Sequence, residues 1–151
     1  MAKVLVIRLS AIGDVAMTVP VIYSAAKANP EDSFTVLTQA FLMPLFMNRP
    51  PNVEVIGINT KGAEKGLIGL LKFISALLKF DFDVILDLHN VIRTIIICTF
   101  FRLNGKRVFV LDKARKERKR LTAIKGKRLY PLRPVIVRYA DVFRAAGLLS
   151  L

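Results

Sequence analysis

Two short polar segments directly after apolar runs hold the side chains best suited to chemistry. In the first, Ser10, Gly13 and Asp14 follow the β-branched run Lys3–Arg8. Gly13 permits close approach of a ligand to the backbone, and a helix that begins here would keep Asp14 ionised through its dipole. An ionised carboxylate in a crevice can take the proton of an attacking hydroxyl. The alternative is that Ser10 and Asp14 merely cap the helix.

The same segment excludes the common nucleotide-binding loops. It has neither the spacing of G-x-G-x-x-G nor the Gly-Lys-Ser/Thr ending of a Walker A loop. We therefore expect no dinucleotide cofactor.

The second segment runs from Asp87 to Arg93 and contains His89 and Asn90. His89 is the only histidine, and a lone histidine is more often a hydrogen-bonded structural residue than a catalyst. With no second histidine and only one cysteine, Cys98, we expect no metal site and no disulfide. The lack of a disulfide framework favours a reducing compartment. Cys98 itself lies in an apolar run and is expected in the core.

Strand-like and helix-like segments alternate along the chain. A proline, Pro20, inside the first helix predicts a kink or a late start, and Asn104-Gly105 and Gly147 predict helix ends. The expected strands are Lys3–Arg8, Ser33–Thr38, Val53–Ile58, Asp83–Leu88 and Lys106–Leu111, and the expected helices are Asp14–Asn29, Phe41–Met47, Glu64–Lys79, Val91–Leu103 and Pro134–Ala146.

This alternation predicts an α/β fold, a doubly wound parallel sheet of Rossmann-like type with strand order 3-2-1-4-5. Ligands of such folds bind beyond the carboxyl ends of the strands, where the winding reverses. We therefore expect the loop Leu9–Asp14 to face the loop His89–Arg93 across one crevice, with the segment that begins at Asp112 on the same edge.

The formal net charge of +13 is concentrated in the last third of the chain. Residues 1–101 hold nine Lys/Arg and eight Asp/Glu, whereas residues 102–151 hold fifteen and three. Such a block is a solvated face or a surface for polyanions: nucleic acid, anionic lipid or a phosphorylated glycan.

The chain is apolar, with 54% hydrophobic residues and a mean hydropathy of +0.47, yet no apolar run approaches the ~20 residues that cross a bilayer. The run Leu67–Phe80 is most simply a buried helix face, and a membrane-surface role is the alternative. No secretory signal is evident after Met1.

Three segments, in order along the chain, resemble one known family. Lys3-Val-Leu-Val-Ile-Arg-Leu-Ser-Ala-Ile-Gly-Asp-Val-Ala-Met-Thr-Val-Pro20 resembles the opening of the bacterial heptosyltransferases of the lipopolysaccharide inner core, glycosyltransferase family nine. Phe82–Arg93 is similar to that family's second signature, and Asp112–Arg118 to its basic segment after the fifth strand.

The resemblance implies the N-terminal, acceptor-side domain of a GT-B enzyme that moves heptose from ADP-heptose to a Kdo-lipid A acceptor with inversion. Asp14 would be the general base. Carboxylates and phosphates of the acceptor would meet the basic residues, since arginine binds such groups in bidentate fashion. The implied acceptor-binding residues are Ser10, Gly13, His89, Asn90, Arg93, Lys113, Arg115, Arg118 and Arg120.

Family members are about twice as long as this chain. We therefore expect residues 1–151 to form one domain, with the donor-binding domain absent and no transferase activity in isolation. The resemblance implies a cytoplasmic protein held peripherally at the inner face of the plasma membrane, with no specific nucleic-acid partner. A basic nucleic-acid-binding module and a membrane scaffold without catalysis are the alternatives.

Overall fold

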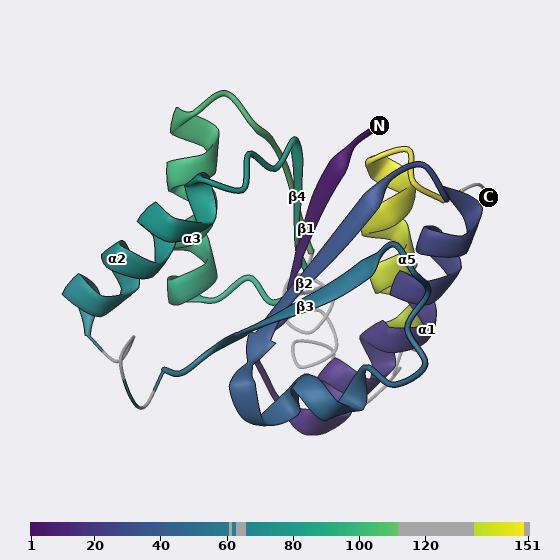
Figure 1. The fold of residues 1–151 in the computed structure, drawn as a ribbon, viewed down its shortest axis with the longest axis horizontal. Helices are drawn as coiled ribbons and strands as arrows, with labels where there is room; N and C mark the ends of the chain where they lie inside the picture. Colours follow the sequence, from purple (N-terminus) through teal and green to yellow (C-terminus); the bar gives the residue numbers. More distant parts are fainter. Residues whose placement is uncertain (61, 63–65, 112–134, 150–151) are drawn as a thin grey trace, which may run out of the picture.

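The computed structural model describes residues 1–60, 62, 66–111 and 135–149 and shows a five-stranded parallel sheet between two helical layers (Figure 1). The strand order is β3-β2-β1-β4-β5, with every neighbouring pair parallel, which confirms the predicted fold class and order. The strands are β1 (Lys3–Ile7), β2 (Ser33–Gln39), β3 (Val53–Ile58), β4 (Val84–Asp87) and β5 (Arg107–Val110).

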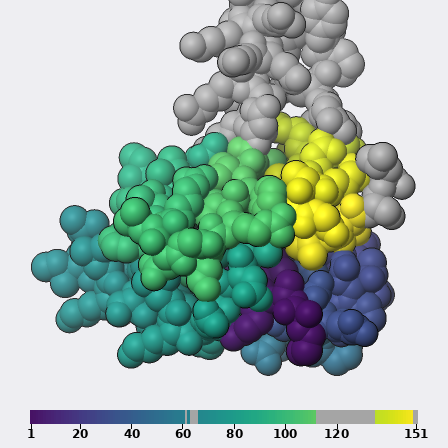
Figure 2. All heavy atoms as spheres, turned by 90° about the horizontal axis from the view of Figure 1, so that it is seen from above, coloured from purple at the N-terminus to yellow at the C-terminus, as the bar shows by residue number. Residues whose placement is uncertain are grey.

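In the described part of the chain, two α-helices cover each face of the sheet. On one face α1 packs beside α5, and on the other α2 packs beside α3 (Figures 1 and 2). In Figure 2 the N-terminal residues lie between these two groups. The helices are α1 (Ile12–Ala28), α2 (Leu67–Leu78), α3 (Ile92–Leu103) and α5 (Val135–Ala145), and a 3₁₀ helix, η1 (Ala40–Leu45), follows β2.

The central strand shows why the sheet is buried on both faces. Side chains alternate along a strand, so Val4 and Val6 enter the core under α1 and α5, whereas Leu5 and Ile7 enter the core under α2 and α3. All four are fully buried. The same alternation directs the next residue, Arg8, toward the α1 and α5 face, and this places a cation at the carboxyl edge.

The start of α1 corrects three predictions. The helix begins at Ile12 rather than Asp14, its N-cap is Ala11, and no side chain caps it, so the capping roles of Ser10 and Asp14 are wrong. The carboxylate of Asp14 pairs with Arg8 instead of the helix backbone. Pro20 does not delay the helix, which runs through it.

Elsewhere the elements differ from the prediction at their ends, and one helix differs in type. The predicted helix over 41–47 is a 3₁₀ helix because Pro44 lacks the N–H that an α-helical turn needs. The predicted turns at Gly105 and Gly147 are confirmed, with φ of 77° and 80°, a region that glycine enters without strain. No helix in the described ranges is long and apolar enough to cross a membrane.

Candidate functional site

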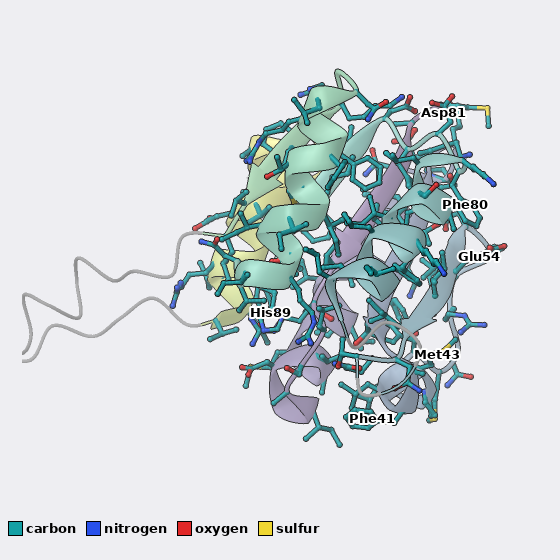
Figure 3. The ribbon with its side chains drawn as sticks, turned by 90° about the vertical axis from the view of Figure 1, so that its left-hand side faces the viewer. Phe41, Met43, Glu54, Phe80, Asp81 and His89 are labelled. Carbon is teal, nitrogen blue, oxygen red and sulfur yellow. The ribbon has the colours of Figure 1, made fainter. Side chains whose placement is uncertain are left out.

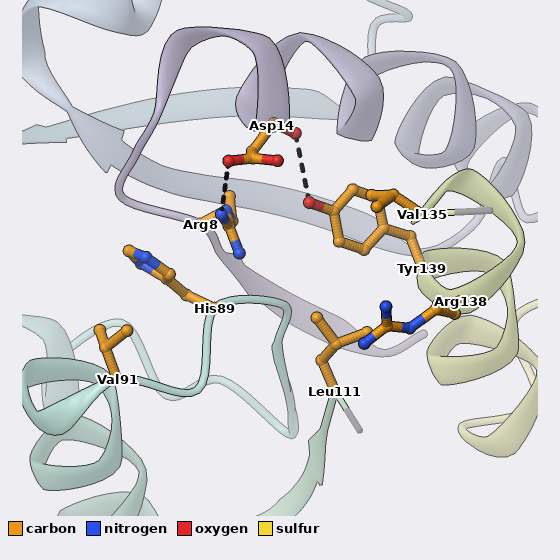
Figure 4. Close-up of a pocket in the computed structure, with 8 residues that line it drawn as sticks. All are labelled: Arg8, Asp14, His89, Val91, Leu111, Val135, Arg138 and Tyr139. Atoms are coloured by element: carbon orange, nitrogen blue, oxygen red, sulfur yellow. Dashed lines mark hydrogen bonds and ion pairs between the residues drawn. The ribbon is translucent and has the colours of Figure 1, made fainter. Parts of the chain in front are cut away.

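A pocket of about 280 Å³ opens at the carboxyl edge of the sheet, where β1, β4 and β5 end (Figure 4). Strands β1 and β4 are neighbours there although 80 residues separate Leu9 from His89. The predicted juxtaposition of the first and fourth loops is therefore confirmed. The described residues lining the pocket are Arg8, Asp14, His89, Val91, Leu111, Val135, Arg138 and Tyr139.

Asp14 lies in the first turn of α1 and is held by Arg8. One guanidinium nitrogen of Arg8, Nη2, is 3.0 Å from Asp14 Oδ2, and the side chains are 13% and 44% exposed respectively. Arg8 Nη1 donates to the carbonyl of Leu88 at 3.0 Å, while the buried Nε has no partner among the described residues. The carboxylate is thus oriented by a mostly buried cation and remains open to the pocket.

The loop after β4 is bonded directly to the loop after β1. His89 Nδ1 accepts the backbone N–H of Leu9 at 3.3 Å. An acceptor at Nδ1 requires the neutral ring to carry its proton on Nε2. Figure 4 shows Arg8 between Asp14 and His89, so the pocket combines a proton acceptor, a cation and an imidazole.

Asp87, at the end of β4, shapes this loop from the opposite face of the sheet. Its side chain is fully buried, and Oδ1 accepts the backbone N–H groups of His89 and Asn90, both at 2.9 Å. Asn90 has a left-handed φ of 54°, which asparagine tolerates better than most residues. Its Nδ2 donates to the carbonyl of Leu111 at 3.2 Å, tying the β4 loop to the end of β5.

Tyr139 of α5 closes the pocket against α1. The phenol is almost fully buried and donates from its hydroxyl to the main-chain carbonyl of Asp14 at 3.3 Å. Burial raises the pKa of Tyr139, the Arg8 charge lowers it, and the Asp14 charge raises it. The net shift is upward, so the hydroxyl stays a neutral donor that anchors the backbone next to the carboxylate.

The predicted site residues are only partly brought together. Asp14 and His89 line the pocket, whereas Ser10, Gly13, Asn90 and Arg93 are not among its described lining residues. Asn90 is engaged with Leu111, which makes its observed contact a structural one. Gly13 is exposed and a Cβ there would meet nothing within 4 Å, so the fold itself does not require glycine. Lys113, Arg115, Arg118 and Arg120 lie outside the described residues.

Three polar pocket residues were missed by the sequence interpretation: Arg8, Arg138 and Tyr139. The alternation of side chains along the first strand could have predicted Arg8, because Arg8 follows Val4 and Val6 on one face at the end of a buried strand. No sequence signal indicates that Arg138 and Tyr139 reach the site, because that depends on the packing of α5 against α1.

Cys98 lies in the core, as predicted. It is 1% exposed, and its thiol donates to Asp87 Oδ2 at 3.8 Å. Burial, followed by the nearby Asp87 charge, raises the pKa of Cys98 to about 12. Within the described ranges, no group of three or more His, Cys, Asp or Glu could hold a metal ion.

A second pocket, of about 480 Å³, lies at the opposite edge of the sheet and includes Lys3, Glu54 and Phe80. Figure 3 shows Glu54 and Phe80 toward the end of the molecule opposite His89. The second pocket is larger, yet the first is at the winding reversal where ligands of this fold bind, and it holds the carboxylate that can accept a proton. The first pocket is therefore the candidate site.

No protein-family model and no curated protein sequence matches this chain. Solved structures do match its fold. A family 9 glycosyl transferase from Veillonella parvula superposes with a TM-score of 0.72 at 20% identity, over 98% of this chain and 42% of the other. The E. coli heptosyltransferase WaaC with ADP-2-deoxy-2-fluoro heptose has a TM-score of 0.66 at 20% identity, over 95% of this chain and 47% of its own.

The chain has the Rossmann-like fold found in part of a family 9 glycosyltransferase. It spans less than half the length of these structures. A UGT transferase from Siraitia grosvenorii in complex with UDP is more distant, with a TM-score of 0.56 at 11% identity over 74% of this chain. The fold that the sequence resemblance implied is thus confirmed.

Proposed function

We propose that this chain forms the acceptor-side domain of an inverting glycosyltransferase that moves heptose from ADP-heptose to a Kdo-lipid A acceptor. The observation that carries the proposal is the carboxylate of Asp14, open to a pocket at the winding reversal and held 3.0 Å from Arg8. The solved heptosyltransferase with the matching fold was determined with an ADP-heptose analogue, which supports the choice of donor.

In the proposed reaction an acceptor hydroxyl oxygen attacks the anomeric carbon of the heptose. The bond from that carbon to the diphosphate oxygen breaks, and ADP leaves with the bonding electron pair. Asp14 takes the hydroxyl proton as the new bond forms, which maintains the nucleophilicity of the oxygen. No metal, cofactor or covalent intermediate is needed for this balance.

The cations of the pocket suit an anionic acceptor. Arg8 and Arg138 both line it, and arginine binds carboxylates and phosphates with two parallel hydrogen bonds. His89 lines the same pocket and is the third polar group on this side of it proposed to contact the acceptor. We also propose that Arg93 and the basic residues Lys113, Arg115, Arg118 and Arg120 extend this surface, and that ADP-heptose binds mainly outside residues 1–151.

The test is a transfer assay on the complete protein, with ADP-heptose and Kdo-lipid A, that measures both ADP release and heptose incorporation. Asp14→Asn should lower kcat at least about 100-fold because it removes the proton acceptor. Asp141→Asn is the matched control, since Asp141 forms an ion pair of the same 3.0 Å length with Arg144 on α5 but is not a described lining residue.

Full activity of Asp14→Asn would overturn the role of this carboxylate. Residues 1–151 alone should bind the acceptor but transfer no sugar. Measurable turnover of ADP-heptose by this domain would refute the proposal that the donor binds mainly outside residues 1–151. Steeply salt-dependent binding to arbitrary DNA, without binding to Kdo-lipid A, would instead favour a nucleic-acid-binding module.

A further inference from the structure

The second pocket lies where α2 and α3 leave part of one sheet face uncovered. Lys3 and Thr35 each come two positions before a leucine that these helices bury, and side chains alternate along a strand, so both residues point to the helix-covered face. Glu54 points the same way, because it is the neighbour of Thr35 in the ladder between β2 and β3. All three line the pocket and are exposed or half-buried. The hollow of about 480 Å³ is within the size range of small-molecule sites.

Two phenylalanines that follow α2 form an apolar wall of this pocket. The rings of Phe80 and Phe82 are stacked, with centroids 5.7 Å apart and an angle of 18° between their planes. Phe82 is 1% exposed and therefore fixed in the core, whereas Phe80 is 48% exposed. Because stacking already holds Phe80, an apolar or aromatic group of a ligand can pack on it with little loss of side-chain freedom.

Lys3 gives the pocket a cation that is already held in position. Its ammonium group donates to the main-chain carbonyl of Phe80 and lies 5.9 Å from the centroid of the Phe82 ring. Both partners are neutral, and none of the ion pairs between described residues includes Lys3. An ammonium group has three donors. Lys3 can therefore also donate to an anionic group of a ligand, without first giving up a carboxylate partner.

Glu54 supplies the opposite charge from two strands away. Lys3 is the neighbour of Ser33 in the ladder between β1 and β2, and Glu54 is the neighbour of Thr35 on β3. Two strand spacings and two residues along a strand therefore separate the Cα atoms of Lys3 and Glu54 by roughly 12 Å. No ion pair joins the two side chains, and Figure 3 shows Glu54 on the same side of the molecule as Phe80. The pocket thus holds a cation and an anion with a gap between them that a small molecule can span.

We infer that the second pocket binds a small zwitterion with an aromatic or large apolar body, the chemical class of the aromatic amino acids. The ligand carboxylate would bind Lys3, its ammonium group would bind Glu54, and its side chain would pack on Phe80. An uncharged ligand would cover both charges without replacing their water, and a ligand with one charge would leave the other charge uncompensated. The pocket lies at the sheet edge opposite the pocket of Asp14, so its evidence is separate from that for sugar transfer.

The first test is a titration of the 151-residue chain with L-phenylalanine, followed by the backbone amide resonances in NMR. A ligand of this size should bind saturably with a Kd of about 1 mM. Binding should shift the resonances of Thr35 and Glu54 and leave those of Asp14 and His89 unchanged. Phe80→Ala should weaken binding by about threefold or more, because it removes the exposed ring.

Two analogues test the charges without any change to the protein. N-acetyl-L-phenylalanine lacks the ammonium group, and phenethylamine lacks the carboxylate. Each should bind about threefold or more weakly than L-phenylalanine, because each loses one charged contact.

Variants then assign each charge to its partner. Glu54→Gln should weaken binding of L-phenylalanine by about threefold or more and should not weaken binding of N-acetyl-L-phenylalanine. Lys3→Gln should weaken binding of both carboxylates and should not weaken binding of phenethylamine. Glu31→Gln and Lys79→Gln are the matched controls, since both residues are exposed near the pocket in sequence but are not among its described lining residues. Each control should change binding by less than about twofold.

Three outcomes would overturn the proposal: no saturable binding up to about 10 mM, analogues that bind as tightly as L-phenylalanine, or losses in the control variants as large as those in Glu54→Gln and Lys3→Gln. Resonances of Thr35 and Glu54 that shift with protein concentration alone would show that a second copy covers the pocket and would also overturn it. Asp14→Asn should leave binding of L-phenylalanine unchanged. Failure of this site and failure of sugar transfer are therefore distinguishable.

Discussion

Replacement of Asp87, the last residue of β4, by alanine should destabilise the protein far more than replacement of Asp83, the residue just before that strand. The Asp87 carboxylate is fully buried and accepts two backbone N–H groups, from His89 and Asn90, at 2.9 Å each. Asp83 is exposed and accepts one, from Lys3, at 2.8 Å. The pair compares a buried and an exposed carboxylate acting on the backbone.

The magnitude follows from the hydrogen bonds lost. Bonds to a charged acceptor contribute roughly 1.5–3 kcal/mol each, so two give roughly 3–6 kcal/mol. The desolvation cost of the buried carboxylate, which alanine removes, offsets part of this. A net loss of about 3 kcal/mol is expected for Asp87→Ala. Asp83→Ala should cost at most about 1 kcal/mol, because Asp83 is exposed and water screens and replaces its single bond.

The assay is urea unfolding of residues 1–151, supported by thermal unfolding. For a chain of this length, about 3 kcal/mol corresponds to a fall in Tm of about 6–12 °C. Asp87→Asn retains an acceptor oxygen and should recover much of the loss. If Asp87→Ala unfolds with the same free energy as Asp83→Ala, the Asp87 carboxylate does not hold the loop.

Three further predictions concern stability and the site. Gly57→Ala should destabilise the protein by about 1–3 kcal/mol in urea unfolding, because a Cβ would lie 2.8 Å from the backbone Cα of Ala40. Gly13→Ala should stabilise α1 by up to about 1 kcal/mol, because a Cβ added at this position meets no atom within 4 Å. If the acceptor approaches this backbone closely, the same change should weaken acceptor binding measured by calorimetry. Burial raises the pKa of Cys98 from 9.0 to about 12, so above about pH 9 the unfolded thiol ionises first and stability falls as pH rises. From about pH 8 to about pH 10, the free energy of unfolding of Cys98→Ala should therefore fall by about 1 kcal/mol less than that of the parent protein. Equal falls in the two proteins would contradict the raised pKa of Cys98.

Local sequence patterns were sufficient for the order of the elements, because burial on both sheet faces requires continuous apolar strands. Val53–Ile58 was predicted to the residue, and the other strands to within one residue at each end. Helix starts were less predictable. Asp14 has the residue type of a cap, but a cation 3.0 Å away competes for its carboxylate, and no local pattern reveals that competition.

The sequence by itself determined the parallel sheet, its winding reversal and the meeting of the Asp14 and His89 loops. These follow from periodicity and from the handedness of strand–helix–strand connections. Tertiary structure alone decided what surrounds Asp14: Arg8 from the end of β1, Tyr139 from α5, and a histidine ring oriented by the backbone of Leu9. The contacts of Leu9 with His89 and of Asp14 with Tyr139 join residues 80 and 125 positions apart, and their geometry depends on packing distances that no local preference encodes.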